Sequence, residues 1–574
     1  MQSKKWIMRE KNYSKEEVLR LSKELSLPPV VITILLLRGV TDVRRFINAN
    51  DSLLHDPFLM KNVKEATQRI IDAIKNKEKI TVYGDYDVDG ITSTVMLVRF
   101  LKSHGALADY YIPDRLEEGY GINTDAIDTI SEEGTNLLIT VDCGITALSE
   151  IEYAKEKGLD VIVTDHHECK QKLPRADFII NPKQPGCTYP FKKLAGVGVV
   201  FKLIQAITLK LKFHMKELLD EYIDLVAIGT VADVMPLEDE NRIIVKNGLK
   251  HILYTANHGI KALIKVADIK TDNITTSTIG FGLAPRINAA GRMGNPDSAA
   301  ALLLCEDETE ALKYAMVLEE ENRDRQALEN EIYNEAIGII NENDGFKDDY
   351  VLVLCHDGWH HGIVGIVASK ISEKYNKPCI LISTDEEGDG KGSGRSIKAF
   401  NLFEALTQCS EHLIKFGGHE LAAGLGVKKS KIDDFRKAIN KIAKEKLKKE
   451  DFIPVINIDT EMPIEYLNLN TAEKLAVLQP YGMGNPAPVF YTKDLTVVSV
   501  RALSEGKHLR MTLIKNDLFI DAVGFGMGEK AELLNHGDKV DVVYNLDINV
   551  FRGEKQAQIH LKDLRRKSSS DKGN

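Results

Sequence analysis

The fold is decided by the stretch Ile80-Thr-Val-Tyr-Gly-Asp-Tyr-Asp-Val-Asp-Gly90, where an apolar, β-branched run ends in aspartates at alternate positions. Two later apolar runs, residues 137–141 and 161–164, also end in polar groups: Asp142-Cys-Gly144 follows the first and Asp165-His-His167 the second. Segments with helical patterning separate the three runs. Buried strands that alternate with helices predict a parallel sheet with helical crossovers.

The patterns outside this sheet predict an α/β protein with several domains. A long polar segment with apolar residues at helical spacing indicates a connecting helix, and a second set of strands and helices follows it. Within that second set, residues 386–394 are rich in glycine and acidic residues, which predicts a loop. Short alternating strands near the C-terminus predict an all-β barrel. We therefore expect an N-terminal helical segment packed on the catalytic domain (1–75), a parallel-sheet catalytic domain (76–305), a connecting helix (306–345), a second α/β domain (346–450), an all-β barrel (451–565) and a disordered tail (566–574).

Composition and charge narrow the class of protein. The sequence contains no run of about 18 apolar residues, which is the length needed to cross a membrane. The N-terminal Met1-Gln-Ser-Lys-Lys-Trp6 does not look like a secretory signal. We therefore expect a cytoplasmic protein. The seven cysteines are scattered without a CxxC pair, which argues against disulfides and thiolate zinc sites. The net charge of -10 argues weakly against nucleic-acid binding, although two bound divalent cations would return about four positive charges locally.

The polar groups that follow the strands predict a metal site. The carboxyl ends of parallel strands meet at one edge of a sheet, so five aspartates and two histidines could converge there. Carboxylates crowd together only when cations neutralise them. Oxygen and imidazole ligands without thiolate suit Mn²⁺ or Mg²⁺. Two such ions about 3.5–4 Å apart can activate water and stabilise the attacking and leaving oxygens of a phosphate ester, which predicts a two-metal hydrolase.

Each motif alone has a simpler interpretation. The D-x-D-x-D-G string also begins a calcium-binding loop, although Met96 stands where such a loop has Glu. Asp142 alone could cap a helix, and a His-His pair could be a polar surface feature. A fourth carboxylate could come from Asp233 or from Asp224, and the residues alone do not choose between them. The coincidence of motifs at three strand ends favours the metal site.

Together these motifs resemble the DHH phosphoesterase family, and over nearly the whole chain the sequence is similar to the single-strand-specific 5′ to 3′ exonucleases of that family. The resemblance implies metal ligands from four motifs, namely Asp85, Asp87, Asp89, Asp142, His166 and Asp233. The resemblance leaves open which of Asp85, Asp87 and Asp89 supports the other ligands without contacting a metal itself. Asp142 would bridge both metals, and His167 would lie near the substrate phosphate. The implied catalytic residues are Asp87, Asp142, His166 and His167.

The second α/β domain resembles the DHH-associated domain, and the C-terminal segment resembles an oligonucleotide-binding barrel. Glycines let backbone amides approach a phosphate, while Arg and His can donate charge-assisted hydrogen bonds. The candidate substrate-binding residues are Arg286, His360, His361, Ser393, Arg395, Ser396, Gly417, Gly418 and His419. Arg286 could instead form an interdomain ion pair, and the Gly-Gly-His string could be only a turn. The barrel adds Lys507, His508 and Arg510 as candidate contacts to a single strand.

These expectations combine into one function and two alternatives. The resemblance implies a 5′ to 3′ exonuclease of DNA repair and recombination that degrades single-stranded DNA to 5′ mononucleotides with two Mn²⁺ or Mg²⁺ ions. It also implies a single-strand-binding protein and a helicase as partners. One alternative is a phosphodiesterase of short oligoribonucleotides, cyclic dinucleotides or phosphonucleosides, against which the barrel and the chain length argue. The other is a non-catalytic single-strand-binding replication protein, which predicts lost ligands, whereas all are present.

Overall fold

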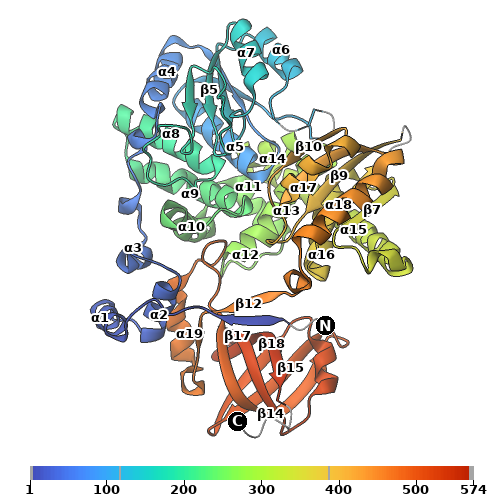
Figure 1. The fold of residues 1–574 in the computed structure, drawn as a ribbon. Coiled ribbons are helices and arrows are strands. Elements are labelled where there is room, and N and C mark those ends of the chain that lie inside the picture. Colours follow the sequence, from blue (N-terminus) through green and yellow to red (C-terminus); the bar gives the residue numbers. More distant parts are fainter. Residues whose placement is uncertain (1–3, 116–117, 120, 385–387, 568–574) are drawn as a thin grey trace. The chain divides into compact units, whose positions relative to one another are not determined.

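The computed structural model describes residues 4–115, 118–119, 121–384 and 388–567 (Figure 1). The chain divides into two compact units, one of residues 50–452 and one that combines residues 1–49 with 453–574. From residue 568 onward, the tail that we predict to be disordered lies outside the described residues. Among the described residues, no helix is both long and apolar enough to span a membrane.

The first sheet of the larger unit is parallel throughout, as predicted. Its strands, in spatial order, are β3 (Leu107–Tyr111), β2 (Lys79–Tyr83), β4 (Leu137–Val141), β5 (Asp160–Thr164) and β6 (Phe178–Ile180). Because β2 pairs with β3 on one side and with β4 on the other, the strand order reverses at β2. Such a switch point opens a crevice at the carboxyl ends of the strands, where ligands bind.

Three long helices pack on one another beside this sheet: α5 (Val88–Ser103), α8 (Gly196–Leu211) and α9 (Met215–Ala232) (Figure 1). Their apolar residues are almost all buried, since each helix contacts neighbours on several sides. Such all-round apolar helices belong to the interior of a large domain. The three helices therefore form a rigid support for the loops that join them to the strands.

The predicted connecting helix is α15 (Glu308–Glu342), which runs for 35 residues. It packs against α11 (His258–Val266), α13 (Ala284–Met293) and α14 (Pro296–Leu304) of the catalytic part, and against α16 (His361–Tyr375) of the second α/β part. Buried Glu329 of α15 forms ion pairs with Arg325 on the same helix and with Lys370 on α16. The helix therefore joins the two α/β parts within one unit.

The second sheet is mixed, with the spatial order β10 (Lys415–Gly418), β11 (Ala422–Lys428), β9 (Asp389–Arg395), β8 (Cys379–Thr384) and β7 (Leu352–Asp357). The prediction of a loop over residues 386–394 is wrong from Asp389 onward, where the chain forms the central strand β9. A Cβ atom on Gly392 would lie 3.0 Å from Leu425 Cδ1, and one on Gly394 would lie 2.7 Å from Leu402 Cδ2. The glycines thus serve close packing of the sheet against apolar neighbours.

The smaller unit contains the predicted barrel. Its strands are β14 (Phe490–Leu503), β15 (His508–Lys515), β16 (Leu518–Gly524), β18 (Glu554–Arg566) and β17 (Lys539–Phe551) in that spatial order, with the short β13 (Thr460–Glu461) beside β14. An additional pairing of β14 with β17 closes the barrel. This strand order is that of a closed barrel of five strands, an architecture that removes exposed sheet edges.

The N-terminal segment belongs to the barrel unit and not to the catalytic domain on which we expected residues 1–75 to pack. Helices α1 (Lys15–Leu25), α2 (Pro29–Leu37) and α3 (Val43–Asn48) share one hydrophobic core with the barrel strands. Strand β1 (Lys5–Met8) also pairs with β12 (Val455–Ile458), which precedes the barrel. From Asn50 onward the segment belongs to the larger unit, and α4 (Val63–Asn76) packs in the catalytic core. The apolar pattern of a helix does not say which core buries it, so the sequence could not place this segment.

Candidate metal centre

The loop between β2 and α5 carries the first motif and is folded tightly. Asp87 caps α5, because one of its carboxylate oxygens accepts hydrogen bonds from the amides of Asp89 and Gly90, at 2.9 and 3.0 Å. Asp85 is 4% exposed. A Cβ atom on Gly90 would lie 2.4 Å from the carbonyl oxygen of Asp85, so only glycine allows the helix to begin this close to the loop. Three carboxylates are thereby held within one short turn.

Asp89 is held by the N-terminus of a second helix. Its two carboxylate oxygens accept hydrogen bonds from the amides of Gly196 and Val197 at the start of α8, at 2.7 and 2.8 Å. A Cβ atom on Gly196 would lie 2.6 Å from Asp142 Oδ1. The first turn of α8 therefore packs directly on two carboxylates, and the partial positive charge of its amides stabilises them.

Asp142 follows β4 in the left-handed backbone region, with φ of 60°, which Asp tolerates better than most residues. Its amide donates a hydrogen bond to the carbonyl of Thr164 at 3.0 Å, and its side chain is almost fully buried. Asp233 caps the C-terminus of α9 and contributes the fourth carboxylate. The competing Asp224 is engaged elsewhere in the core, by the amide of Leu225 and the hydroxyl of Thr255. The geometry therefore brings Asp233, and not Asp224, to the cluster.

Asp165 orients the two histidines that follow it. One of its oxygens accepts hydrogen bonds from the amides of His166 and His167, at 2.7 and 3.0 Å, and from Nδ1 of His167 at 2.7 Å. The other oxygen accepts from the amide of Ile145 at 2.9 Å. Burial would raise the pKa of Asp165, but these hydrogen bonds and the charge of His167 lower it below its usual value. Asp165 is thus a fixed anion that positions the imidazoles.

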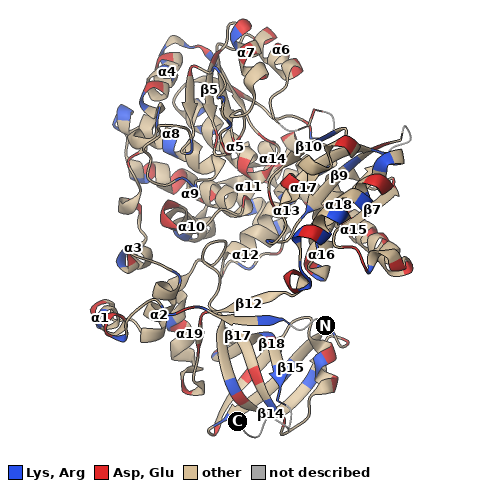
Figure 2. Cartoon of the chain, in the orientation of Figure 1, with Lys and Arg blue, Asp and Glu red and all other residues tan. Residues whose placement is uncertain are grey.

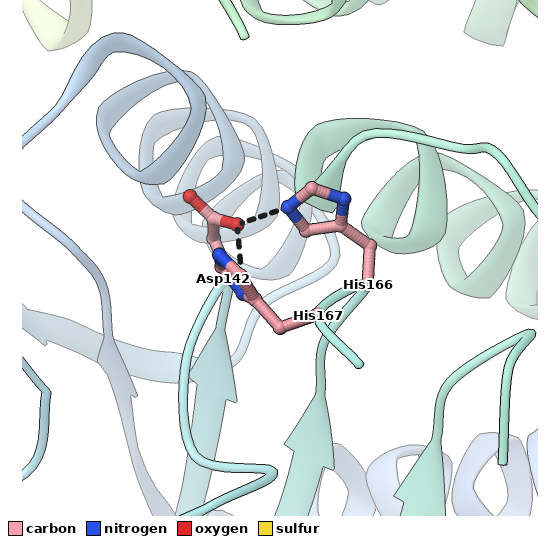
Figure 3. A group of neighbouring side chains, drawn as sticks. All are labelled: Asp142, His166 and His167. Carbon is pink, nitrogen blue, oxygen red and sulfur yellow. Dashed lines mark ion pairs between the residues drawn. The ribbon is translucent and has the colours of Figure 1, made fainter. Parts of the chain in front are cut away.

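The separate motifs meet in space, as Figure 3 shows for Asp142, His166 and His167. Nε2 of His166 lies 3.2 Å from Oδ1 of Asp142, 3.6 Å from Oδ2 of Asp233 and 3.9 Å from Oδ2 of Asp89. Among the described residues, three groups have ligand atoms within 4.8 Å of one another: Asp85 with Asp87 and Asp142; Asp89 with His166 and Asp233; and Asp142 with His166 and His167. Asp142 belongs to two of these groups and therefore lies between two candidate metal positions.

The pKa values of the carboxylates reflect mutual repulsion in a buried site. Burial and the neighbouring aspartates raise the pKa of Asp85 and Asp142 well above the usual value, that of Asp89 to about 7 and that of Asp233 to about 8. Burial and the charge of His167 lower the pKa of His166 to about 3. Burial would also lower the pKa of His167, but its hydrogen bond to Asp165 raises it to about 9. A neutral imidazole at His166 is the form that binds a metal.

Orphaned oxygens test whether a metal fits this site. Oδ1 of Asp85, Oδ1 of Asp142 and Oδ2 of Asp233 are buried and accept no hydrogen bond from any part of the chain that the structure describes. Buried polar atoms of this kind are costly unless a water or an ion satisfies them. Carboxylate oxygens together with one imidazole are a donor set suited to Mn²⁺ or Mg²⁺. The residues present therefore fit divalent cations.

Three residues of the second α/β part, His360, His361 and Arg395, lie near Arg115, whose guanidinium lies beside the first motif. His360 caps α16, and its Nδ1 accepts a hydrogen bond from the amide of Gly362 at 3.2 Å. Burial and the nearby charges of Lys391 and Arg115 lower the pKa of His361 to about 4. Nη1 of Arg395 donates to Oγ of Ser393 at 3.1 Å. Arg395 is the one cation among these partly buried polar side chains, and their binding roles stay predictions.

The remaining substrate-binding candidates lie in less suggestive surroundings. The hydroxyl of Ser396 donates to the carbonyl of Phe400 at 2.7 Å and so serves the local fold. Gly417, Gly418 and His419 are exposed on or beside the edge strand β10. Arg286 donates to Glu319 of α15 at 2.5 Å, so the ion pair that the sequence left open is present. Their contacts with substrate also stay predictions.

Arg115 is a candidate that the sequence motifs did not reveal. Its guanidinium lies 5.1 Å from the centre of the Tyr86 ring, directly beside the first motif. Burial, together with the charges of Arg115, Arg325 and Arg395, lowers the pKa of Arg292 to about 10, so these guanidinium groups gather in one region. The sequence contains one signal that could have identified Arg115, which is its position after β3. The carboxyl end of β3 lies at the same edge of the sheet as the metal-binding motifs.

This combination of fold and site defines a member of the DHH family. The family model of the DHH N-terminal domain matches residues 79–230, and that of the DHHA1 domain matches residues 348–445. The model of the RecJ OB domain matches residues 458–563. The chain belongs to the RecJ family, whose members are named single-stranded-DNA-specific exonucleases.

Relatives and solved structures agree over most of the chain. RecJ of Bacillus subtilis is 43% identical over 96% of this chain and 69% of its own length. RecJ of Escherichia coli is 33% identical over 94% of this chain and 96% of its own length. The crystal structure of Thermus thermophilus RecJ in complex with Mn²⁺ has a TM-score of 0.85 at 29% identity, covering 98% of this chain and 80% of that chain. A Mg²⁺ complex of the same protein has a TM-score of 0.79 at 27% identity, covering 98% of this chain and 79% of that chain.

Proposed function

We propose that this chain is a cytoplasmic, divalent-cation-dependent exonuclease that hydrolyses single-stranded DNA from the 5′ end to 5′ mononucleotides, in DNA repair and recombination. The observation that carries the proposal is the set of buried carboxylate oxygens without hydrogen-bond partners on Asp85, Asp142 and Asp233, of which the last two lie within 3.6 Å of Nε2 of His166. The RecJ family supports the substrate, and solved RecJ structures with Mn²⁺ or Mg²⁺ support the cations. The 5′ to 3′ direction rests on the family resemblance.

Two cation positions are proposed from the grouping of ligand atoms. Asp85 and Asp87 would hold one cation, Asp89, His166 and Asp233 the other, and Asp142 would contribute to both. When bound, two divalent cations would polarise the scissile phosphate and favour ionisation of the attacking water. Among the first three aspartates, Asp89 alone accepts backbone hydrogen bonds from α8 on both oxygens. We propose that Asp89 holds the N-terminus of α8 in place and also binds a cation.

The histidines have different proposed tasks. His166, with a pKa lowered to about 3, keeps a lone pair for a cation at neutral pH. His167, with a pKa raised to about 9, carries a proton that can be donated to a phosphate oxygen or to the leaving 3′ oxygen. Asp165 holds the ring of His167 by its Nδ1. The chain thus separates a metal-binding imidazole from a proton-donating one.

The basic group around the centre is proposed to hold the DNA backbone. Arg115, Arg292 and Arg395 lie near one another and near His361, as their mutual effects on pKa show. Guanidinium groups bind phosphate oxygens with two parallel hydrogen bonds. A phosphate bound there would relieve the repulsion between these cations. We therefore propose that the substrate is anchored through its phosphates, which needs no particular base sequence.

The test is digestion of single strands labelled at either the 5′ or the 3′ end, with Mn²⁺ or Mg²⁺ and with EDTA. The wild-type chain should release labelled mononucleotide first from the 5′-labelled strand, and EDTA should stop the reaction. Asp142→Ala should lose activity, whereas Asp109→Ala, which removes an exposed carboxylate from the same sheet, should not. If labelled mononucleotide were released first from the 3′-labelled strand, digestion would run from 3′ to 5′, opposite to the proposed direction.

The alternative of a small-substrate phosphodiesterase is tested by the same reaction with a dinucleotide. The barrel unit favours long strands, because a dinucleotide needs no second binding surface. Faster hydrolysis of the dinucleotide than of a long strand, compared as kcat/KM, would favour the alternative. A single-strand-binding protein and a helicase remain the proposed partners on family resemblance alone.

A further inference from the structure

Lys183 is a cation beside the metal centre that belongs to none of the ligand motifs. It lies in the turn that follows β6, at the carboxyl edge of the parallel sheet. Its side chain is 21% exposed, and its Nζ lies 2.9 Å from Oε1 of Glu168, the residue that directly follows His167. The chain therefore places an ion pair immediately next to the two histidines of the centre.

Hydrogen bonds fix the backbone that carries Lys183. The side chain of Asn181 is fully buried and bridges two segments, because its Nδ2 donates to the carbonyl of His167 at 3.0 Å and its Oδ1 accepts from the amide of Lys183 at 2.8 Å. Nζ of Lys192 donates to the carbonyl of Pro182 in the same turn at 2.7 Å. One buried amide thus ties the position of Lys183 to that of a candidate catalytic histidine.

The charge of Lys183 acts on one of the two proposed cation positions. Burial lowers the pKa of His166 and raises that of Asp233, and in both cases the charge of Lys183 lowers the pKa. Burial also raises the pKa of Asp85, and there the opposing charge is that of Arg115. Lys183 therefore lies beside the second position and Arg115 beside the first, so the two cations flank the centre.

The ion pair of Lys183 is one that can easily be exchanged. The side chain of Glu168 is 72% exposed, and ion pairs open to water contribute little to stability. A lysine ammonium is a point charge on a flexible stem, so it can turn from a carboxylate to a phosphate. Basic and acidic residues are interspersed over the larger unit, as Figure 2 shows, so the attraction of a strand to the centre depends on single cations close to it.

We propose that Lys183 contacts the substrate, binding a phosphate next to the scissile one on the side of the centre opposite Arg115, and that Glu168 pairs with Lys183 when no strand is bound. The Glu168 carboxylate thus takes the place of a phosphate and is displaced by the strand. Lys183 would select strands that carry a charged phosphate at this position. This inference rests on the proposed function and adds a specificity-determining pair to it.

The pair is tested first by binding, with the full-length chain in EDTA and fluorescence anisotropy of a labelled oligothymidine of about 20 nucleotides. Lys183→Gln should weaken binding about tenfold and reduce the slope of log K against log salt by about 0.7, as expected for one lost phosphate contact. Glu168→Gln should tighten binding about threefold, because the competing carboxylate is removed. If both variants weakened binding equally, the pair would serve only the fold and the proposal would be overturned.

Arg175→Gln is the matched control for the loss of an exposed ion pair. The guanidinium of Arg175 lies 2.9 Å from Oε1 of Glu152, and Arg175 precedes β6, so it lies toward the opposite edge of the sheet from the centre. Its removal should leave binding and the salt slope at the wild-type values.

Substrates that lack one charge locate the contact. In single-turnover reactions with Mn²⁺ below saturation, one strand has a 5′-hydroxyl in place of a 5′-phosphate, and another has a neutral methylphosphonate at its second linkage. One of these changes should slow wild-type cleavage of the first linkage about tenfold, and the same change should have no effect on Lys183→Gln, in which the contact is already missing.

The same reactions separate this inference from the function on which it rests. If neither change slowed the wild-type chain, or if each slowed both proteins by the same factor, Lys183 would contact neither phosphate and the proposal would be overturned. Failure of the wild-type chain to cut the unmodified strand would instead reject the proposed function.

Discussion

Oδ1 of Asp142 lies 3.2 Å from Nε2 of His166, although the two residues follow different strands. Strands β4 and β5 are neighbours in the parallel sheet, so their carboxyl ends bring these groups together. Burial and the charge of Asp89 raise the pKa of Asp142 well above its usual value. This arrangement is costly in the chain alone and becomes favourable when cations bind.

Asp142→Asn should separate stability from activity. Removing this carboxylate relieves repulsion by its neighbours once it is ionised, so in EDTA at alkaline pH, where its raised pKa permits ionisation, the melting temperature should rise by about 2–4 °C. Hydrolysis of single-stranded DNA should fall by a factor of about a thousand or more, because a proposed shared ligand is lost. Differential scanning calorimetry and the end-label assay measure the two effects. A variant that is less stable than the wild type and still active would refute the assignment.

Cations should counteract the loss of stability that the metal-free chain shows as pH rises. The pKa values of Asp89 and Asp233 are raised to about 7 and about 8 in the folded chain, against about 4 when unfolded. A carboxylate whose pKa is raised by folding binds more protons in the folded state, so without metal the stability falls as pH rises from about 4 to about 8. Cations bind the deprotonated form, so the Mn²⁺-induced rise in melting temperature should grow between about pH 6 and pH 8. A Mn²⁺ effect that shrinks over this range would count against the site.

Gly196→Ala should disable the centre without changing any charge. The added Cβ atom would lie 2.6 Å from Oδ1 of Asp142, so either α8 or the carboxylate must move. Activity should fall about a hundredfold or more, since small displacements of ligands have large effects on catalysis. Gly338→Ala is the matched control, because this helical glycine has no neighbouring atom within 4 Å of the added Cβ. Equal activity of the two variants would show that the contact at α8 is unimportant.

Asp459→Ala should loosen the barrel unit. Asp459 is buried and forms ion pairs with Arg38 at 2.9 Å and with Arg9 at 3.1 Å, which tie the N-terminal segment to the chain before the barrel. Removing one partner of a buried ion pair costs about 3–5 kcal/mol, because the remaining charge is uncompensated. Limited proteolysis should then cut within residues 1–49 or 453–567 more quickly than in the wild type. Glu532→Ala, an exposed residue of the same unit, should leave the rate unchanged.

The sheet and the metal cluster could be predicted because their signals are local. Each strand is a short apolar run, and each ligand motif follows directly at its carboxyl end, so parallel pairing brings Asp142 and His166 together. Asp233 was ambiguous from the residues alone, since only the fold shows that Asp224 is engaged by Thr255. Strand β9 was missed because its glycines suit a turn as well as a closely packed strand. Arg115 belongs to no recognisable motif, and its proposed role depends on arginines that are distant from it in the sequence.

The central claim, that two divalent cations bind around Asp142, is tested most directly by anomalous diffraction from crystals soaked in MnCl₂. Two peaks should lie about 3.5–4 Å apart, one beside Asp85 and Asp87 and the other beside His166 and Asp233, with Asp142 between them. Crystals in which no manganese is found among these residues, or in which it binds only on the surface, would contradict the account.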